Sequence, residues 1–470
     1  MNKIKLLRIA FLVLFTFAAT TVPAQKKPIS LHPENPHYFS YKGKPTILIT
    51  SGEHYGAVIN PDFDYKTYLK ALQKDGLNLT RTMTGAYFEP VGAFNIAQNT
   101  LAPNPQNFLC PWSRAGKEEN AVKGLRFDLN QWDTAYFTRL KDFVSKAKKR
   151  GIIVELALFC PFYEDAQWDL SPFNSLNNIN GLGTIPRTVV YTLDKNKGLL
   201  AVQEKMVRKI VAELKSFPNV IYEICNEPYF GGITVEWQNY IAQVISDAEK
   251  SFSNKHLISQ NIANGAQKIQ SPNPLVSVFN FHYAAPPKAV TINYGLNKVI
   301  GDNETGFNGQ KDSTYRKEAW EFILAGGGLF NNLDYSFTTY NEDGTFKYPS
   351  AQPGGGNPVY RKQLSYLKKF IESFNFVAMK PDTTVYSEGL PGNSTATVLA
   401  EFGKQYAIYM MGGKQVNLEV ILPKGCYTIE WISPLTGRTE KKSSLNHQGG
   451  KVSLESPVIS EDIALRILLN

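Results

Sequence analysis

The stretch Ile221-Tyr222-Glu223-Ile224-Cys225-Asn226-Glu227-Pro228 decides the fold that we expect for this chain of 470 residues. The stretch begins as an apolar run after Pro218-Asn219, and Ile-Tyr-Glu-Ile favours a β-strand. Pro228 has no N–H to donate to a sheet, so the strand must end before it. Asn226 and Glu227 therefore follow the C-terminal end of a strand, which is where a parallel barrel carries its functional side chains. The alternative is a surface loop with one solvated glutamate.

A similar arrangement recurs at Glu304. Residues 298–302 (KVIGD) predict a short strand, and Asn303-Glu304-Thr305-Gly306 follows it directly, with a glycine that permits a tight turn. Two carboxyl groups at the ends of separate strands suit the hydrolysis of glycosidic bonds. One stays protonated and donates to the leaving oxygen, while the other ionises and either attacks or activates water.

This ordered pair of motifs resembles the superfamily of retaining barrel glycosidases that carry catalytic glutamates after strands four and seven, which includes many cellulases and mannanases. The resemblance extends over roughly residues 30 to 378. It implies that Glu227 is the acid/base, that Asn226 beside it binds the substrate, and that Glu304 is the nucleophile. Burial and the charge of Glu304 should raise the pKa of Glu227.

Residues at other strand ends are further candidates for substrate binding. Arg81 matches the family's arginine that hydrogen-bonds the nucleophile, and its cation would lower the pKa of Glu304; a salt bridge at the barrel rim is the alternative. His282-Tyr283 closes the sixth strand, where the family often uses a tyrosine; a structural histidine is the alternative. Glu53 and His54 follow the first strand and could bind sugar hydroxyls, or form a salt bridge.

The sequence departs from the family pattern after the eighth strand. Many members carry a tryptophan platform there, whereas residues 331–337 (NNLDYSF) contain none. Tyr335 could replace the platform, and Asp334 could bind sugar hydroxyls. The departure bears on the substrate more than on the type of reaction.

Apolar runs alternate with amphipathic segments from Pro45 onward, which predicts strand–helix units around a parallel sheet. The fold class is therefore α/β, a (β/α)8 TIM barrel over residues 25–378. The expected strands cover residues 46–49, 77–82, 152–159, 221–224, 257–260, 276–281, 298–302 and 328–332. The expected helices cover residues 64–75, 132–149, 198–216, 234–252, 314–325 and 358–374.

Three long loops are expected on the same side of the barrel as the two glutamates. They cover residues 83–131, 160–197 and 335–357, and long irregular loops in a compact domain are usually functional. The third contains Ala351–Asn357 (AQPGGGN), which predicts a flexible flap or a close backbone approach. Aromatic residues in these loops could stack on sugars or anchor the loops: Trp112, Tyr163, Trp168 and Tyr340.

Residues 379–470 have a different sequence pattern, in which short segments rich in β-forming residues alternate with Gly/Pro/Asn turns. They predict a small antiparallel β-sandwich. The segment resembles the C-terminal β-domain found beside barrel glycosidases, including the type named for collagen binding. We expect it to pack on the barrel, and a glycan-binding module is the alternative.

Residues 1–24 predict a secretory signal peptide, because Lys3, Lys5 and Arg8 precede an apolar run that ends at Val22-Pro23-Ala24. Export to the periplasm or the medium is therefore expected, without insertion in the membrane. Removal of this segment lowers the formal charge from +9 to +6. The excess is spread along the chain, which argues against a nucleic-acid partner.

No cofactor or metal is expected, since the six histidines are scattered and the four cysteines lack metal-ligand spacing. Cys160 and Cys225 follow adjacent strands and could be neighbours, with buried free thiols favoured over a disulfide. The sequence thus predicts an exported, retaining hydrolase that cleaves β-glycosidic bonds of a plant or microbial polysaccharide or oligosaccharide. A catalytically inactive carbohydrate-binding barrel is the alternative, and the oligomeric state is left open.

Overall fold

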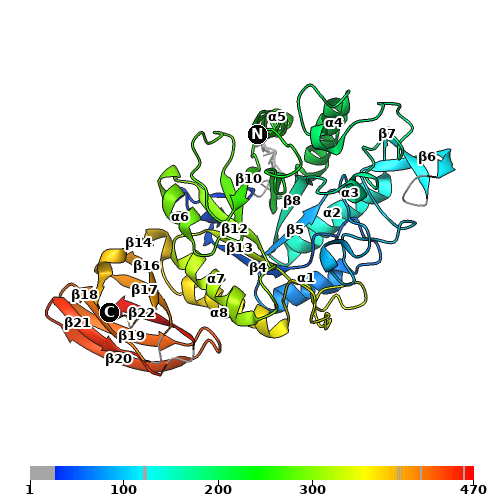
Figure 1. Ribbon diagram of the computed structural model, residues 1–470. Helices are drawn as coiled ribbons and strands as arrows, with labels where there is room; N and C mark the ends of the chain where they lie inside the picture. The colour runs from blue at the N-terminus through cyan, green and yellow to red at the C-terminus, as the bar shows by residue number, and fades with distance from the viewer. Residues whose placement is uncertain are drawn as a thin grey trace, which may run out of the picture.

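Eight parallel strands form a barrel surrounded by helices, and antiparallel sheets at the C-terminal end of the chain pack beside it (Figure 1). The computed structural model describes residues 27–119, 124–388, 390, 392, 394–412, 415–458 and 461–470. The segment expected to be a signal peptide lies outside these residues. Within the described chain, no helix is both long and apolar enough to cross a membrane.

The barrel strands occur in the order β4-β13-β12-β11-β10-β9-β8-β5. At the seam between β4 and β5, the backbone bonds Asn78 N–H to Ile49 O (3.3 Å) and Met83 N–H to Tyr55 O (3.1 Å) bring the ends together. The strands are β4 (Leu48–Gly52), β5 (Leu79–Met83), β8 (Ile153–Phe159), β9 (Val220–Cys225), β10 (Leu257–Asn264), β11 (Val278–His282), β12 (Val299–Thr305) and β13 (Leu329–Leu333).

The helices begin where the sequence supplies caps. Side chains of Asp64, Asp133, Thr234 and Asn357 accept hydrogen bonds from the first turns of their helices. The helices are α1 (Tyr65–Lys74), α2 (Thr134–Lys149), α3 (Asp165–Trp168), α4 (Leu199–Leu214), α5 (Val235–Ala248), α6 (Lys288–Asn293), α7 (Asp312–Leu324) and α8 (Pro358–Glu372). Short 3-10 helices cover Ala93–Asn95, Arg187–Val189, Tyr294–Leu296, Phe376–Ala378 and Thr383–Val385.

The predicted barrel is confirmed, with differences at a few element ends. The strand β10 continues to Asn264, α5 already ends at Ala248, and α6 follows β11 where no helix was expected. Glu304 lies within β12 and not after it, because the parallel pairing with β11 continues as far as the pair His282–Glu304. The glutamate is therefore held by the sheet itself.

A small sheet closes the end of the barrel that is remote from the two glutamates. It contains β1 (Ser30–Leu31), β2 (Phe39–Tyr41) and β3 (Lys44–Thr46). Phe39 and Tyr41 join an apolar cluster with residues from the beginnings of the barrel strands, among them Leu48, Leu79 and Ile221. Burial of this cluster excludes water from the end of the barrel that is remote from the two glutamates.

The long loops contain some regular structure. The first carries the hairpin β6 (Trp112–Glu119) and β7 (Leu125–Trp132), and the second carries α3. In the third, the glycine-rich segment makes the close backbone approach that its sequence allows: a Cβ at Gly354 would lie 1.9 Å from the carbonyl oxygen of Gly306. Only glycine fits there without a shift of the neighbouring loop.

The C-terminal sandwich has two antiparallel sheets with the orders β14-β16-β17-β22-β19-β20 and β15-β18-β21. Alternate residues such as Ile408, Trp431 and Val420 fill its core. The strands are β14 (Lys380–Pro381), β15 (Tyr386–Glu388), β16 (Thr395–Glu401), β17 (Gln405–Met411), β18 (Asn417–Leu422), β19 (Gly425–Ile432), β20 (Thr439–His447), β21 (Gly450–Glu455) and β22 (Asp462–Leu469).

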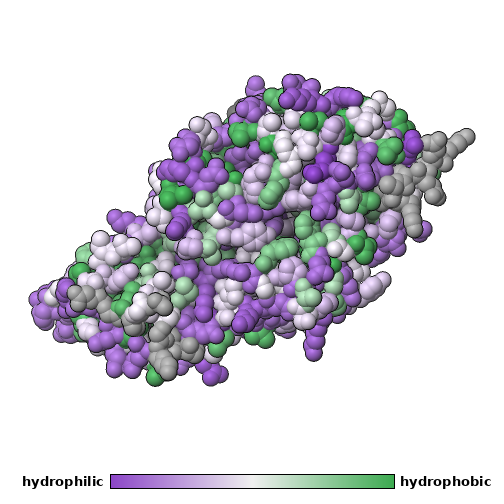
Figure 2. Space-filling model, viewed as in Figure 1, coloured by the Kyte–Doolittle hydropathy of each residue, from purple (hydrophilic) through white to green (hydrophobic). Residues whose placement is uncertain are grey.

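The sandwich packs on the barrel through α7, which lies with α8 on the side that faces it (Figure 1). Trp320 stacks on Tyr409 with ring centroids 5.4 Å apart. Asp462 accepts hydrogen bonds from Arg316 Nε (3.0 Å) and from the hydroxyl of Tyr409 (2.7 Å). On the face that Figure 2 shows, hydrophilic and hydrophobic residues are interspersed over both parts of the chain.

Candidate active site

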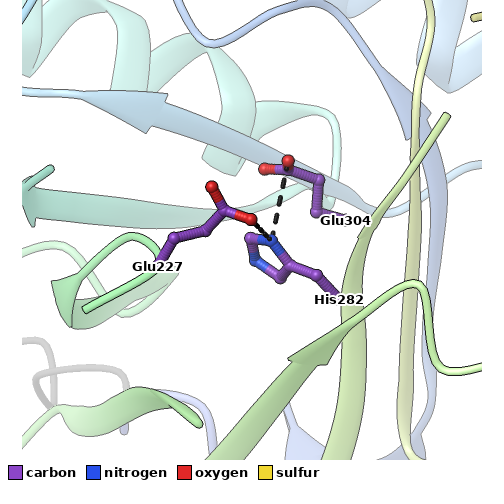
Figure 3. Close-up of side chains that lie close together, drawn as sticks. All are labelled: Glu227, His282 and Glu304. Atoms are coloured by element: carbon purple, nitrogen blue, oxygen red, sulfur yellow. Dashed lines mark hydrogen bonds and ion pairs between the residues drawn. The ribbon is translucent and has the colours of Figure 1, made fainter. Parts of the chain in front are cut away.

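Glu227 and Glu304 point toward each other across the C-terminal end of the barrel, with His282 between them (Figure 3). One carboxylate oxygen of each glutamate and Nδ1 of His282 all lie within 4.8 Å of one another. The Nδ1 atom is 3.2 Å from Glu227 Oε1 and 3.6 Å from Glu304 Oε1. Among the described residues, this is also the one group of three side chains that could surround a metal ion.

The sequence predicted the three strands that position Glu227, His282 and Glu304. Glu227 follows β9 in the segment that Pro228 ends, with a φ of 35°, a strained conformation for a residue with a side chain. Its neighbour Asn226 is tied to β8 by a backbone bond to Phe159 O of 2.9 Å. Glu304 and His282 are paired across β12 and β11, so the sheet sets their separation.

Arg81 connects the segment that carries Glu227 with the strand that carries Glu304. Its guanidinium donates to Glu304 Oε2 (3.0 Å), to Asn226 Oδ1 (2.7 Å) and through two nitrogens to Glu223. The side chain is buried, and although burial lowers the pKa of Arg81, the nearby carboxylates Glu223 and Glu304 raise it well above its usual value. A permanent cation therefore contacts Glu304, as the family resemblance implied for this position.

Glu227 has three hydrogen-bond donors around its carboxylate. They are the hydroxyl of Tyr163 (2.6 Å to Oε2), the hydroxyl of Tyr229 (3.2 Å to Oε1) and His282 Nδ1. Burial raises the pKa of Glu227, but these hydrogen bonds and the charge of His282 together outweigh burial, and the pKa is lowered. The raised pKa expected from the sequence is therefore wrong in this structure, because His282 and, to a smaller extent, Tyr163 and Tyr229 stabilise the carboxylate.

Tyr283 holds the other carboxylate. Its hydroxyl donates to Glu304 Oε1 at 2.9 Å, and its backbone N–H donates to the carbonyl oxygen of Glu304 at the same distance. Glu304 thus receives hydrogen bonds from Tyr283 and Arg81 at different oxygens, which fixes the orientation of its carboxylate.

A cavity of about 330 Å³ opens over the two carboxylates. Its volume lies near the lower end of the range for ligand pockets, roughly 300–1,000 Å³. Aromatic and polar residues share the lining, as in a sugar-binding site: His54, Tyr55, Met83, Glu89, Phe94, Leu101, Cys160, Tyr163, Asn226, Glu227, Phe230, Asn264, Tyr283, Glu304 and Phe307.

Six candidates from the sequence do not line this cavity: Arg81 and His282, which contact the glutamates, and the four that follow. Glu53 is buried and accepts bonds from the N–H groups of Gly56 and Ala57, so it fixes the turn after β4. Asp334 is buried in an ion pair with Arg361 at 2.6 Å. Trp168 packs its ring on Phe162 in the second long loop, and Tyr335 lies behind His54 and Phe307.

Of the four aromatic loop residues singled out in the sequence, only Tyr163 lines the cavity, and its hydroxyl contacts Glu227. Trp112 is buried under the first loop, and Tyr340 is 87% exposed. Sequence reasoning missed Tyr229, Phe94, Phe230, Phe307 and Glu89. Tyr229 and Phe230 come directly after Pro228, and Phe307 comes three residues after Glu304, so proximity to the two glutamates was the signal that could have found three of them.

The four cysteines form no disulfide within the described chain, in agreement with the expected free thiols. Cys160 and Cys225 are both buried beside Asn226, with sulfur–Asn226 contacts of 3.5 Å to Nδ2 and 3.2 Å to O, respectively. Burial raises the pKa of Cys160, whose thiol is therefore neutral.

Comparisons with known proteins agree with this geometry. A family model described as cellulase (glycosyl hydrolase family 5) matches residues 40–293. No curated protein sequence matches the chain.

Solved structures share the fold at low sequence identity. A protein described as a glycoside hydrolase aligns with a TM-score of 0.64 and 13% identity, covering 95% of this chain and 97% of its own. A glycoside hydrolase family 5 protein from Bacteroides vulgatus aligns with a TM-score of 0.63 and 13% identity, covering 94% and 93%. A family 5 mannosidase from Rhizomucor miehei covers 74% of this chain and 99% of its own, with a TM-score of 0.51 and 12% identity. Because the family model spans more than half of the chain, the protein belongs to glycosyl hydrolase family 5 and is a glycoside hydrolase.

Proposed function

We propose that this glycoside hydrolase cleaves β-glycosidic bonds with retention of configuration. The supporting observation is the separation of the two carboxylates, with oxygens of Glu227 and Glu304 within 4.8 Å of each other. Retaining enzymes place their carboxyl groups about 5–5.5 Å apart, whereas inverting enzymes need about 6.5–9.5 Å to admit a water molecule.

In the first step, Glu304 attacks the anomeric carbon and forms a glycosyl-enzyme, while Glu227 donates a proton to the leaving oxygen. Arg81 and Tyr283 donate hydrogen bonds to different oxygens of Glu304 and hold its carboxylate in place for the attack. In the second step, Glu227 takes a proton from water, which attacks the anomeric carbon and releases the sugar from Glu304.

The substrate class that we propose is a β-linked polysaccharide or oligosaccharide of plant or microbial origin. The aromatic and hydrogen-bonding lining of the cavity supports a carbohydrate. An inactive binding barrel would have no use for a nucleophile oriented by two donors, so the hydrolase is the better account of Glu304.

The expected pH dependence of activity follows from the lowered pKa of Glu227. Its pKa is lowered, so the protonated fraction that can act as an acid decreases already under mildly acidic conditions. We therefore expect kcat/KM to be highest on the acid side of neutrality. Removing the donor in Tyr163→Phe raises the pKa of Glu227 and should extend the profile toward higher pH.

The roles of the two glutamates can be separated with nitrophenyl β-glycosides. Glu304→Ala should abolish turnover with every leaving group, since no glycosyl-enzyme can form. Glu227→Ala should retain the first step with good leaving groups, and azide should restore the slow second step. Glu440→Ala, at an exposed position of the sandwich, is the control. Equal losses in both active-site variants, without rescue by azide, would contradict the assignment.

We also propose that the enzyme is exported. The support is the sequence of residues 1–24, with a basic start, an apolar centre and Val22-Pro23-Ala24 as the cleavage region. Mass spectrometry of the protein from its native host should find a mature chain that begins near Gln25. An intact N-terminus in the mature protein would disprove export by this route.

A further inference from the structure

Aromatic side chains form a continuous collar over the two carboxylates. Successive ring centroids are 6.3 Å apart for Tyr283–Phe307, 6.4 Å for Phe307–Phe94, 5.5 Å for Phe94–Tyr163 and 5.8 Å for Tyr163–Phe230. Phe94 is the central link, because it joins the loop after β12 to the loop after β8. Phe94 itself comes from the long loop after β5 and lines the cavity.

The loop that carries Phe94 is anchored in place. Asn95 Nδ2 donates to Ala351 O at 3.0 Å, and the N–H of Ala97 donates to Gln352 Oε1 at 2.9 Å. Both bonds cross from the first long loop to the third. Phe94 and Asn95 also have φ values of 52° and 58°, which residues with side chains rarely adopt. A long glycan could not pass between these two loops without breaking the bonds.

A buried polar pair lies beneath the collar. His54 Nε2 is 3.4 Å from Glu89 Oε2, and Glu89 is held in turn by the hydroxyl of Tyr87 at 3.0 Å. Both members of the pair line the cavity, and His54 is only 8% exposed. Neither ring nitrogen of His54 has a hydrogen-bond partner among the residues that the structure describes, and both nitrogens are covered although the residue lines the cavity. Buried polar atoms are normally paired, so a sugar hydroxyl becomes a suitable partner once the ring turns toward the cavity.

The two ends of the cavity differ in their relation to the catalytic carboxylates. The ring of His54 stacks on that of Tyr55 with centroids 5.8 Å apart, and the hydroxyl of Tyr55 donates to the carbonyl oxygen of Asn303, the residue before Glu304, at 3.4 Å. His54 therefore lies on the side of the nucleophile. Tyr229 contacts Glu227 and Asn264 instead, and its neighbour Phe230 is 42% exposed. The sugar attacked by Glu304 would therefore extend toward His54, and the leaving group would extend outward past Tyr229.

We propose that this cavity is a blind pocket and that the enzyme acts on chain ends, removing one sugar at a time from the non-reducing end of a β-linked glycan. The Phe94 collar prevents the glycan from continuing beyond the bound terminal sugar. The His54–Glu89 pair binds hydroxyls of that sugar. This inference rests on the proposed retaining hydrolysis and adds the mode of attack.

The test uses the full chain and four β-linked tetrasaccharides, built from glucose, mannose, galactose or xylose alone. Each tetrasaccharide is labelled at its reducing end. The earliest labelled product should be the trisaccharide, released together with one free sugar. Early labelled mono- or disaccharide would show internal cleavage and overturn the inference, while the proposed function would stand. If neither these compounds nor nitrophenyl β-glycosides are hydrolysed, the proposed function fails and the inference fails with it.

Opening the collar should change the product pattern. Phe94→Ala should raise the share of internal cleavage, and Asn95→Gly should do the same more weakly, because glycine tolerates the left-handed conformation while the bond to Ala351 is lost. Phe402→Ala, at an exposed phenylalanine of the sandwich, is the matched control and should leave the products unchanged. An unchanged pattern in both collar variants, each of them folded by circular dichroism, would overturn the role of the collar.

The polar pair is tested with a deoxy-sugar series. His54→Ala should lower kcat/KM on the best nitrophenyl glycoside by about 10- to 100-fold, the range for loss of one hydrogen bond to a charged group. On the analogue that lacks the contacted hydroxyl, wild type and His54→Ala should be equally slow. If His54→Ala lowers kcat/KM by the same factor on every deoxy analogue, His54 does not bind a hydroxyl of the terminal sugar.

Discussion

Replacing Arg81 with methionine tests whether the buried ion network under the active site stabilises the fold. The guanidinium is fully enclosed and donates to Glu223, Glu304 and Asn226. Methionine occupies a similar length without donors or charge. In Arg81→Met, two buried carboxylates would thus lose their cation, with Asn303 Nδ2 left as a donor to Glu223 at 3.2 Å.

The magnitude follows from the burial of the network. Removing one partner of a buried ion pair costs about 3–5 kcal/mol, because it leaves an uncompensated buried charge. Since Arg81 serves two carboxylates, we expect a loss near the upper end of that range. An exposed pair on one helix face, such as Arg208–Glu204 on α4, contributes only about 0.3–0.5 kcal/mol.

The assay is equilibrium unfolding in urea at neutral pH, with Arg208→Met as the matched control. Arg81→Met should lose roughly ten times as much free energy of unfolding as the control. The double variant Arg81→Met/Glu223→Gln should regain part of the loss, because one unpaired charge is removed. A loss in Arg81→Met no larger than in Arg208→Met, or a double variant less stable than the single one, would refute this reasoning.

Three further predictions concern other parts of the molecule. Burial raises the pKa of Glu53 from 4.5 to about 7. Between these pH values the folded state therefore binds more protons than the unfolded state. The contribution of Glu53 to the free energy of unfolding is lost as the pH rises through 7. Between pH 4 and 8, wild type should therefore lose about 3 kcal/mol of unfolding free energy relative to Glu53→Gln, and parallel pH profiles would contradict this. Gly354→Ala should lose about 1–3 kcal/mol in urea unfolding because its Cβ meets Gly306, whereas Gly295→Ala, which has open space, should change little. Asp462→Asn should lose about 1–3 kcal/mol and speed the release of the sandwich by limited proteolysis, whereas Glu461→Gln, at a half-exposed position, should do neither.

Much of the barrel could be predicted because the sequence patterns that indicate strands and helices are local. Apolar runs indicated the eight strands, and amphipathic segments indicated the helices between them. Pro228 and Gly306 marked the ends of the segments that carry Glu227 and Glu304. The same logic placed Arg81, His282 and Tyr283 at strand ends facing the site, where the structure has them in contact with the two glutamates.

Candidates beyond the strand ends were harder to judge. Glu53 and Asp334 are acidic residues that follow barrel strands, as sugar-binding carboxylates do. In the structure, however, Glu53 accepts hydrogen bonds within a turn and Asp334 forms a buried ion pair. Their partners Thr100 and Arg361 are distant in sequence, and no local pattern indicates such pairings.

The sequence by itself determined the succession of strands and helices, the change to β structure after residue 379, and the pair of glutamates at the C-terminal end of the barrel. Only the tertiary structure decided what surrounds that pair. Tyr163 from one long loop lowers the pKa of Glu227, and Phe94 from another covers the cavity. The physical reason is that loop conformations depend on contacts between remote residues, such as the bond from Asn95 to Ala351, which no periodicity in the chain encodes.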